Sequence, residues 1–165
     1  MERYTFFYRT PSPFSQWHPT RFIIEGLTFN SAEQYMMYKK AVLFHDLEMS
    51  QRILNAKTPR EQKEFGRLVK DFEKEKWDRH CKQFVYDANY AKFTQNQGLL
   101  EILLETRGTT LVEASPTDRI WGVGLLEDDP KIKNRKSWLG KNWLGEILTQ
   151  LREDILRENE KNNME

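Results

Sequence analysis

Residues 22–41 read FIIEGLTFNSAEQYMMYKKA, a stretch in which the hydrophobic pattern changes from that of strands to that of a helix. Phe22–Ile24 and Leu27–Phe29 are short apolar runs on either side of a Glu25-Gly26 turn. Such a pattern predicts a β-hairpin. We expect the rest of the chain to be organised around this hairpin and the helix that follows it.

The helix is predicted to begin at Asn30-Ser31, because either residue is a good N-cap, and Glu33 and Gln34 stand three residues further on, as in a capping box. Glu33 and Lys40 are seven residues apart, so two helical turns return them to nearly the same face. The axial rise between them is about 10 Å, which is too long for an ordinary ion pair. A carboxylate and an amine on an apolar stripe are costly to bury unless a function uses them; the alternative is two solvated charges beside the core.

Before the hairpin, the chain has an aromatic strand and an irregular loop. Tyr4–Tyr8 is an aromatic run that is typical of a strand. Residues 10–19 contain three prolines together with Phe14 and Trp17, and they show no hydrophobic period. This loop is either packed irregular structure or the wall of a pocket.

After the hairpin, the chain is predicted to be mainly helical. Thr58-Pro59 is a clear helix start, and apolar residues from Phe65 through Leu68 to Phe72 follow at the spacing of one buried face. Helices are expected over residues 31–41, 43–56, 58–72, 74–92, 98–106 and 141–156, and a strand over Thr110–Ala114.

These elements predict one α+β domain over residues 1–156, mainly helical, with a small β-sheet built from the N-terminal strands and Thr110–Ala114. Residues 157–165 are almost all polar, so we expect a polar C-terminal tail that frays.

Composition excludes several classes of protein. Charged residues make up 31% of the 165 residues, but the formal net charge is only +1, so no overall basic field favours nucleic acid. The single cysteine, Cys81, cannot form an internal disulfide and is read as a core thiol in a reducing compartment. The histidines have no metal-ligand spacing. No apolar run suits a membrane span or a signal peptide, so we expect a cytoplasmic protein, and we expect a monomer.

Residues 115–124, SPTDRIWGVG, form a second candidate part of a site. Gly122 and Gly124 allow backbone amides to approach a phosphate closely. Trp121 is suited to stacking on a base, although filling the core is the more common role of tryptophan. By sequence alone, Asp118 is better explained as a cap or turn residue than as a catalytic group.

Two basic features are candidates for contacting phosphate. Gly66 lies inside a predicted helix, where glycine is unfavourable unless a ligand or another backbone approaches closely. Arg67 follows it and could bind a phosphate. Between Pro130 and Gly145 the chain has five cations and no acid: Lys131, Lys133, Arg135, Lys136 and Lys141. This basic segment, Lys131–Lys141, is either a rim that contacts nucleic acid or a solvated loop.

Several short motifs follow one another along the chain. They are Phe7-Tyr8, Pro13–Trp17 (PFSQW), Phe29, Glu33–Tyr35 (EQY), Lys40-Ala41, Lys92-Phe93, Glu113–Pro116 (EASP), Asp118–Leu125 (DRIWGVGL) and Gly140–Gly145 (GKNWLG). In this order and spacing they closely resemble the NADAR family (the YbiA-like N-glycosidases, named for NAD and ADP-ribose). The resemblance runs from about Tyr4 to Arg152.

This resemblance implies an N-glycosyl hydrolase that cleaves a base–ribose bond, in ADP-ribosylated guanine or in ribosylated pyrimidine intermediates of riboflavin synthesis. Lys40 matches the family's helix lysine, and a neutral amine there can attack the sugar C1 to give a Schiff base. Glu33 and Asp118 are the candidate proton donor and water-activating base, in an undecided order. The residues expected to bind substrate are Phe14, Trp17, Tyr35, Arg67, Trp121, Gly122, Gly124 and Asn142. No cofactor and no metal is expected.

Two other classes of function stay open. The domain could bind ADP-ribose or a nucleotide without turnover, or it could be a structural partner protein whose aromatic loop is an interface. The presence of both Glu33 and Lys40 favours the enzyme, because a pure binding module has little use for a desolvated amine.

Overall fold

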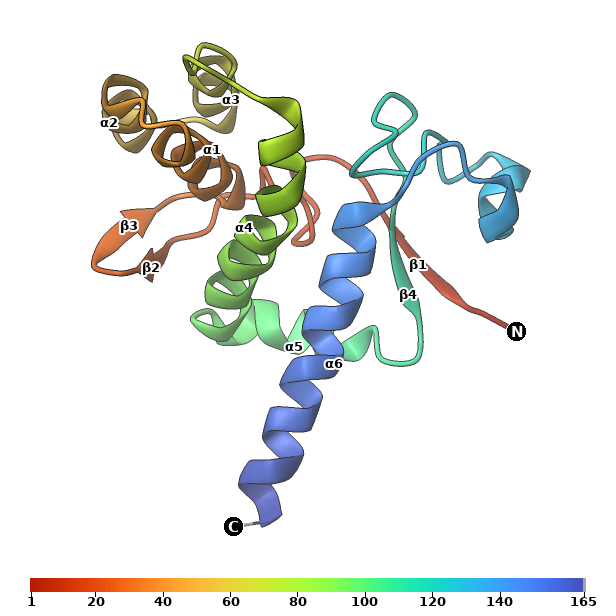
Figure 1. The fold of residues 1–165 in the computed structure, drawn as a ribbon. Helices are drawn as coiled ribbons and strands as arrows, with labels where there is room; N and C mark the ends of the chain where they lie inside the picture. Colours follow the sequence, from red (N-terminus) through yellow and green to blue (C-terminus); the bar gives the residue numbers. More distant parts are fainter. Residues whose placement is uncertain (165) are drawn as a thin grey trace. The chain divides into compact units, whose positions relative to one another are not determined.

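The computed structural model describes residues 1–164, and the chain folds into two compact units (Figure 1). The central unit comprises Gln16–Asn96, and the terminal unit comprises Met1–Ser15 together with Gln97–Glu165. The architecture is α+β and mainly helical, which confirms the predicted fold class. Among residues 1–164, no helix is long and apolar enough to cross a membrane.

The central unit is a β-hairpin followed by helices. Its elements are β2 (Phe22–Ile24), β3 (Leu27–Phe29), α1 (Ala32–Leu43), α2 (Leu47–Asn55), α3 (Pro59–Arg67) and α4 (Lys74–Thr94). α1 packs against α2, α3 and α4, so it is the helix around which the unit is built. The hairpin and helix predicted from residues 22–41 are both present.

The hairpin turns through two residues with left-handed backbone torsions. Glu25 and Gly26 have φ angles of 49° and 79°, as the central residues of a type I′ turn do. Phe22 stacks on Phe29 across the strands, with ring centroids 5.7 Å apart, and Phe29 meets Tyr35 of α1 edge to face at 5.1 Å. These rings belong to the core cluster that holds the hairpin on α1.

Of the two predicted cap residues, Ser31 is the N-cap of α1. Its hydroxyl accepts a hydrogen bond from the Gln34 N–H at 3.1 Å. Gln34 in turn accepts from the Asn30 N–H at 2.7 Å through its side-chain oxygen. Both donors at this helix end are therefore satisfied by side chains, which fixes where the helix begins.

The prediction of a continuous helix over residues 43–56 was wrong, because a sharp turn separates α1 from α2. His45 adopts a φ of 58°, a left-handed conformation that interrupts the helix. Asp46 then caps α2, its carboxylate accepting from the Met49 N–H at 3.1 Å and from the Lys70 N–H at 2.9 Å. The apolar pattern continues across the turn, so periodicity alone could not reveal it.

α3 begins at the predicted Thr58-Pro59 start, but it ends at Arg67 and does not continue to Phe72. Leu68 and Phe72 are 62% and 45% exposed, so the predicted buried face does not include them. After Arg67 the chain crosses to α4 as an irregular segment, residues 68–73. Leu68 and Phe72 are therefore available at the surface of the unit, whereas Val69 of the same segment is buried.

The terminal unit combines a parallel strand pair with helices. Its elements are β1 (Tyr4–Phe7), α5 (Gln97–Glu105), β4 (Thr110–Glu113), the 3-10 turns η1 (Pro130–Lys133) and η2 (Arg135–Ser137), and α6 (Trp143–Met164). β1 and β4 pair in parallel, separately from β2 and β3, so the single small sheet predicted from sequence is two two-stranded sheets. α6 continues to Met164, beyond the end at residue 156 that was predicted for the last helix (Figure 1).

α6 packs closely on β4. A side chain at Gly145 would collide with the Leu111 carbonyl oxygen, so only glycine permits this approach. Thr149 accepts a hydrogen bond from the Leu111 N–H at 2.9 Å. Further along the helix, the buried Arg152 donates to two carbonyl oxygens of the turn that follows α5. These bonds satisfy backbone groups that the two-stranded sheet leaves over.

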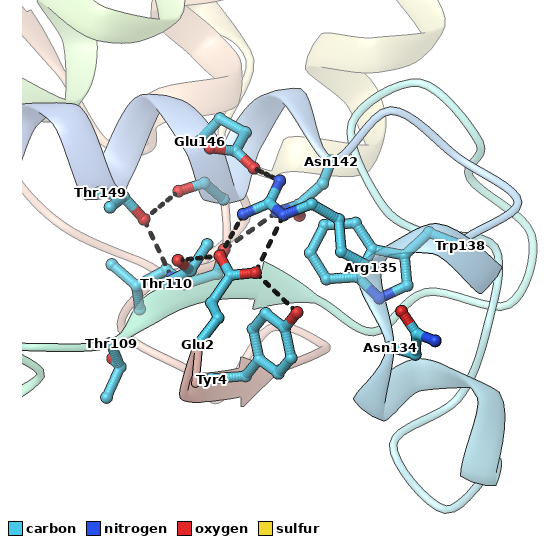
Figure 2. A network of polar contacts seen from close by, with 12 residues as sticks. Glu2, Tyr4, Thr109, Thr110, Asn134, Arg135, Trp138, Asn142, Glu146 and Thr149 are labelled. Atoms are coloured by element: carbon cyan, nitrogen blue, oxygen red, sulfur yellow. Dashed lines mark hydrogen bonds and ion pairs between the residues drawn. The ribbon is translucent and has the colours of Figure 1, made fainter.

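A polar network joins the start of the chain to η2 and α6 (Figure 2). Arg135 forms ion pairs with both Glu2 and Glu146. Glu2 also accepts hydrogen bonds from the hydroxyls of Tyr4 and Thr110, each at 2.7 Å. The hydrogen bond from Arg135 contributes most to holding the pKa of Glu2 down at about 2. One cation of the basic segment is thus committed to the fold.

Candidate active site

One face of α1 carries the predicted catalytic side chains of the central unit. Glu33 lies in the first turn, is 5% exposed, and donates its N–H to the Gln16 carbonyl at 3.0 Å. Lys40 lies in the last turn and is half-buried. Met36 and Met37, which come between them in sequence, are buried. The structure therefore keeps the carboxylate and the amine on a largely buried helix face.

The Lys40 amine lies against two aromatic rings. Its Nζ is 4.6 Å from the ring centroid of Phe72 and 5.7 Å from that of Trp77. Burial lowers the pKa of Lys40, the Glu33 carboxylate opposes this by favouring the charged form, and Arg67 adds to the lowering. Because burial is the largest of the three effects, Lys40 offers more neutral amine than a solvated lysine does.

Gly66 brings α3 close to α1. A Cβ at this position would collide with the side chain of Met37, which fills the space above the glycine. Packing against another part of the protein is therefore the reason for a glycine inside this helix. Arg67 is the next residue and is exposed at the end of α3. The close packing places its charge within electrostatic reach of Lys40.

Gln16 connects the aromatic loop to two helices. Its carbonyl receives the Glu33 N–H, and its Oε1 accepts from Asn89 Nδ2 of α4 at 2.8 Å. Asn89 is fully buried and donates from the same nitrogen to the Val85 carbonyl, which fixes the orientation of both amides. Glu33 is thus positioned by a loop residue that α4 holds in place.

The aromatic residues predicted to bind substrate occupy different environments. Phe14 belongs to the terminal unit, where its buried ring lies 5.6 Å from that of Phe7. Trp17 belongs to the central unit, and the Lys63 ammonium lies 5.8 Å from its ring. Tyr35 points into the core cluster beneath the hairpin, and burial is the main cause that raises its pKa to about 12. Tyr35 therefore has a packing role in this structure.

Asp118 organises the loop that carries Trp121. Its Oδ1 accepts from the N–H groups of Ile120 and Trp121, each at 2.9 Å. This is the turn role that the sequence favoured for Asp118, and both of these bonds use one carboxylate oxygen. Trp121 is half-buried and packs edge to face on Trp143, with ring centroids 5.5 Å apart.

Gly122, Gly124 and Asn142 hold this loop on β4. A Cβ at Gly122 would lie 3.0 Å from two backbone carbonyl oxygens, and Gly124 has a φ of 73°. Asn142 is fully buried; its side chain accepts from the Glu113 N–H and donates to the Leu111 carbonyl, each at 3.0 Å. The side-chain amide of Asn142 is therefore engaged with the backbone of β4.

The predicted site residues fall into two groups. The central unit holds Trp17, Glu33, Tyr35, Lys40 and Arg67, and the terminal unit holds Phe14, Asp118, Trp121, Gly122, Gly124 and Asn142. Within the central unit, Glu33 and Arg67 both act electrostatically on Lys40. Across residues 1–164, no group of three His, Cys, Asp or Glu side chains is arranged to hold a metal ion.

The family model described as NADAR domain matches residues 6–156 of the chain. The chain belongs to the NADAR family. Protein irg-1 of Caenorhabditis elegans is 37% identical to this NADAR protein over 180 residues, covering 98% of this chain and 84% of that one. N-glycosidase R617 of Acanthamoeba polyphaga mimivirus is 42% identical over 146 residues, 86% of each chain. The NMR structure of the E. coli protein YbiA matches with a TM-score of 0.79 and 28% identity, over 96% of this chain and 89% of that one.

These similarities confirm two predictions for this NADAR protein. The match to YbiA extends over nearly the whole chain, so the fold is that of the family. Several relatives carry the name N-glycosidase, at up to 42% identity. The enzyme class, an N-glycosyl hydrolase, is therefore the one predicted from the motifs.

Sequence reasoning gave no role to a second lysine, Lys92 of α4. Its side chain is 0% exposed, and burial lowers its pKa to about 7. Its Nζ lies 5.1 Å from the ring centroid of Phe93. A signal was present: Val85, Ala88 and Lys92 are at positions i, i+3 and i+7, so the lysine occupies the buried face of its helix.

Lys92 should make the stability of the protein depend on pH. Its pKa is about 7 in the folded chain and 10.5 ordinarily, so between these values the unfolded chain binds more protons and the free energy of unfolding rises with pH. Lys92→Met should remove this rise, as measured by urea denaturation between about pH 7 and pH 10. Lys82→Met, an exposed lysine in the same helix, is the matched control. An unchanged pH dependence in Lys92→Met would contradict the prediction.

Proposed function

We propose that this NADAR protein hydrolyses the bond between a base and C1 of ribose, in ADP-ribosylated guanine or in ribosylated intermediates of riboflavin synthesis. The observation that carries the proposal is the Lys40 amine, which is half-buried, has a lowered pKa and lies on the Glu33 face of α1. The names of the N-glycosidase relatives support cleavage of such a bond.

Lys40 is the proposed nucleophile. The neutral amine attacks C1, and the bond from C1 to the base breaks with its electron pair going to the base, which takes a proton from a carboxylic acid. The attacking nitrogen loses a proton, the ring oxygen leaves C1 as a hydroxyl, and an iminium joins C1 to Lys40. Water then adds to C1, and the amine departs to release the sugar. C1 therefore bears positive charge at two stages: while the base leaves, and again in the iminium.

Glu33 and Asp118 are the proposed partners for the proton transfers. Glu33 is buried on the Lys40 face, and its charge acts on the amine. Asp118 is assigned by its match to the family motif; its Oδ1 supports the turn, so its other oxygen is the one proposed for chemistry. The rates of the Glu33→Gln and Asp118→Asn variants decide which carboxyl protonates the base.

The remaining predicted site residues are proposed to bind substrate, as the family motifs imply. Trp17 in the central unit and Trp121 in the terminal unit are assigned to the base, and Arg67 and the backbone at Gly122 and Gly124 to ribose and phosphates. Phe14, Tyr35 and Asn142 are buried, so we propose that they contribute by shaping these surroundings.

A non-catalytic module that binds ADP-ribose or a nucleotide is the alternative. It differs from the enzyme in one measurable respect, since it binds the modified nucleoside without releasing a sugar product. Incubation with ADP-ribosylated guanosine and, separately, with the riboflavin intermediates distinguishes the two by the release of ADP-ribose or ribose 5-phosphate. Binding without release of either product would favour the module.

Lys40→Ala should abolish turnover while the fold survives, because the half-buried amine is the group that attacks C1. Borohydride should trap substrate covalently on the wild type and not on the variant, as read by intact-protein mass spectrometry. Lys39→Ala, at the neighbouring lysine of the same helix, is the control and should keep both turnover and trapping by borohydride. Normal turnover by folded Lys40→Ala would exclude the proposed nucleophile.

Glu33→Gln and Asp118→Asn should each lower kcat by about 10²-fold or more, the usual contribution of a positioned acid or base. The asparagine at position 118 still offers an amide oxygen to the two N–H groups that Oδ1 accepts, so the loop should be kept. The variant whose loss is rescued by a substrate with a better leaving group identifies the acid. Wild-type rates in both variants would make the two carboxylates structural.

The basic segment offers fewer cations to a ligand than the sequence suggests. Arg135 is engaged with two carboxylates, and the Lys141 ammonium lies 5.0 Å from the ring of Trp143. Lys131, Lys133 and Lys136 are exposed. The proposed contact with a nucleic-acid substrate therefore depends on these three lysines.

Replacing these three lysines with alanine should weaken the salt dependence of activity on an ADP-ribosylated oligonucleotide. Each lost phosphate contact lowers the slope of log K against log salt by about 0.7 for a single strand, so three contacts remove about 2. Cleavage of ADP-ribosylated guanosine should be unchanged, and Lys161→Ala at the exposed end of α6 is the control. An unaltered salt dependence would mean that the basic segment is a solvated loop. Equal losses of activity on both substrates would mean that it is part of the substrate pocket.

A further inference from the structure

Phe72 and Trp77 surround the Lys40 amine from two different segments. Phe72 comes from residues 68–73, between α3 and α4, and Trp77 from the first turns of α4. Both rings lie within the range at which an aromatic face attracts a cation, at 4.6 Å and 5.7 Å from Nζ to the ring centroids. The proposed reaction of Lys40, Glu33 and Asp118 uses neither ring.

Phe72 is held firmly but remains accessible. Its ring packs edge to face against Phe44, the C-cap residue of α1, with centroids 5.4 Å apart. It is nevertheless 45% exposed, which is unusual for a phenylalanine whose only role is packing. An ordered aromatic ring that is open to solvent beside a candidate nucleophile is in a position to meet a substrate.

The reaction generates positive charge where these rings are. C1 carries oxocarbenium-like charge as the base leaves, and the iminium then carries charge on C1 and Nζ. Because the attacking Nζ becomes covalently bonded to C1, the sugar carbon must come within a bond length of an atom that lies 4.6 Å from the Phe72 centroid. The negative face of the ring stabilises such a cation, and more strongly where water is excluded.

We propose that Phe72, with Trp77 beside it, is a catalytic residue that stabilises the positive charge developing at C1 and on the Lys40 iminium. This inference rests on the proposed role of Lys40. In the resting enzyme the same rings favour the ammonium form of Lys40, whereas burial lowers its pKa. The Phe72 ring therefore contributes most when positive charge develops on the sugar as the base leaves.

Fluorination of the ring tests the proposal without removing the side chain. Phenylalanine carrying one, two or three fluorines is incorporated at position 72; each fluorine weakens the negative face of the ring and changes its shape little. We expect kcat to fall stepwise, by about 3- to 30-fold across the series, on whichever substrate the protein cleaves. This range corresponds to the usual energy of a cation–π interaction. The pKa of Lys40, followed by NMR of the side-chain amine, should fall in the same order.

Phe84 provides a matched control in the same unit. The Lys39 ammonium lies 5.4 Å from its ring centroid, so this is a second lysine–phenylalanine contact, made by the neighbouring lysine of α1. The same fluorinated series at position 84 should leave kcat unchanged. Phe72→Leu measures the contribution of packing alone.

A flat kcat series at position 72, or a loss seen in Phe72→Leu but not with fluorine, would overturn the inference and leave Phe72 as a packing residue. If Lys40→Ala is inactive and the series is flat, the inference fails and the proposed function stands. If Lys40→Ala turns over normally, the proposed function itself fails. A Lys40 pKa that does not respond to fluorination would overturn the inference independently of turnover.

Discussion

The contact between Gly66 and Met37 is the constraint on which the central unit depends. Without a Cβ at position 66, α3 lies close enough to α1 for the Met37 side chain to fill the space above it. This approach places the end of α3, and hence Arg67, within electrostatic reach of Lys40. It also sets where the following segment starts, and that segment carries Phe72 to the same amine. The packing of α3 on α1 thus contributes to the electrostatics of the candidate nucleophile through Arg67, in addition to the larger effects of burial and Glu33.

The candidate site depends on a balance between desolvation and charge. Burial of Lys40 favours the neutral amine, whereas Glu33 on the same helix face favours the ammonium. A lysine without the carboxylate would be more easily neutral, and one without burial would stay charged. Burial therefore favours the neutral form of Lys40, which can attack, while Glu33 favours the charged form, which can depart.

In the terminal unit, side chains that were predicted to act in catalysis or binding also hold the polar loop in place. Asp118 caps its own turn, and Asn142 bridges two strand residues of β4 from a left-handed backbone position. Arg135 likewise orders the start of the chain through Glu2. Such side chains satisfy backbone and charge requirements that a two-stranded sheet cannot meet by itself. Their motif matches are therefore compatible with structural and chemical roles at once.

The sequence by itself determined the features that local backbone chemistry controls. The left-handed turn at Glu25-Gly26, the cap at Ser31 and the start of α3 at Thr58-Pro59 follow from residues within a few positions of one another. The common face of Glu33 and Lys40 follows from helical periodicity alone. The ordered motifs predicted the family and the enzyme class, because they are spread over nearly the whole chain.

Only the tertiary structure decided which groups surround the amine and which lysine is buried. Phe72 is 32 positions from Lys40 and was predicted to lie in the core; its exposure follows from the early end of α3. Lys92 lies at the spacing of the buried face of α4, but only the packed structure shows that it is fully buried. The turn at His45 interrupts a continuous apolar pattern. Burial, ring contacts and helix ends of this kind depend on how distant segments pack.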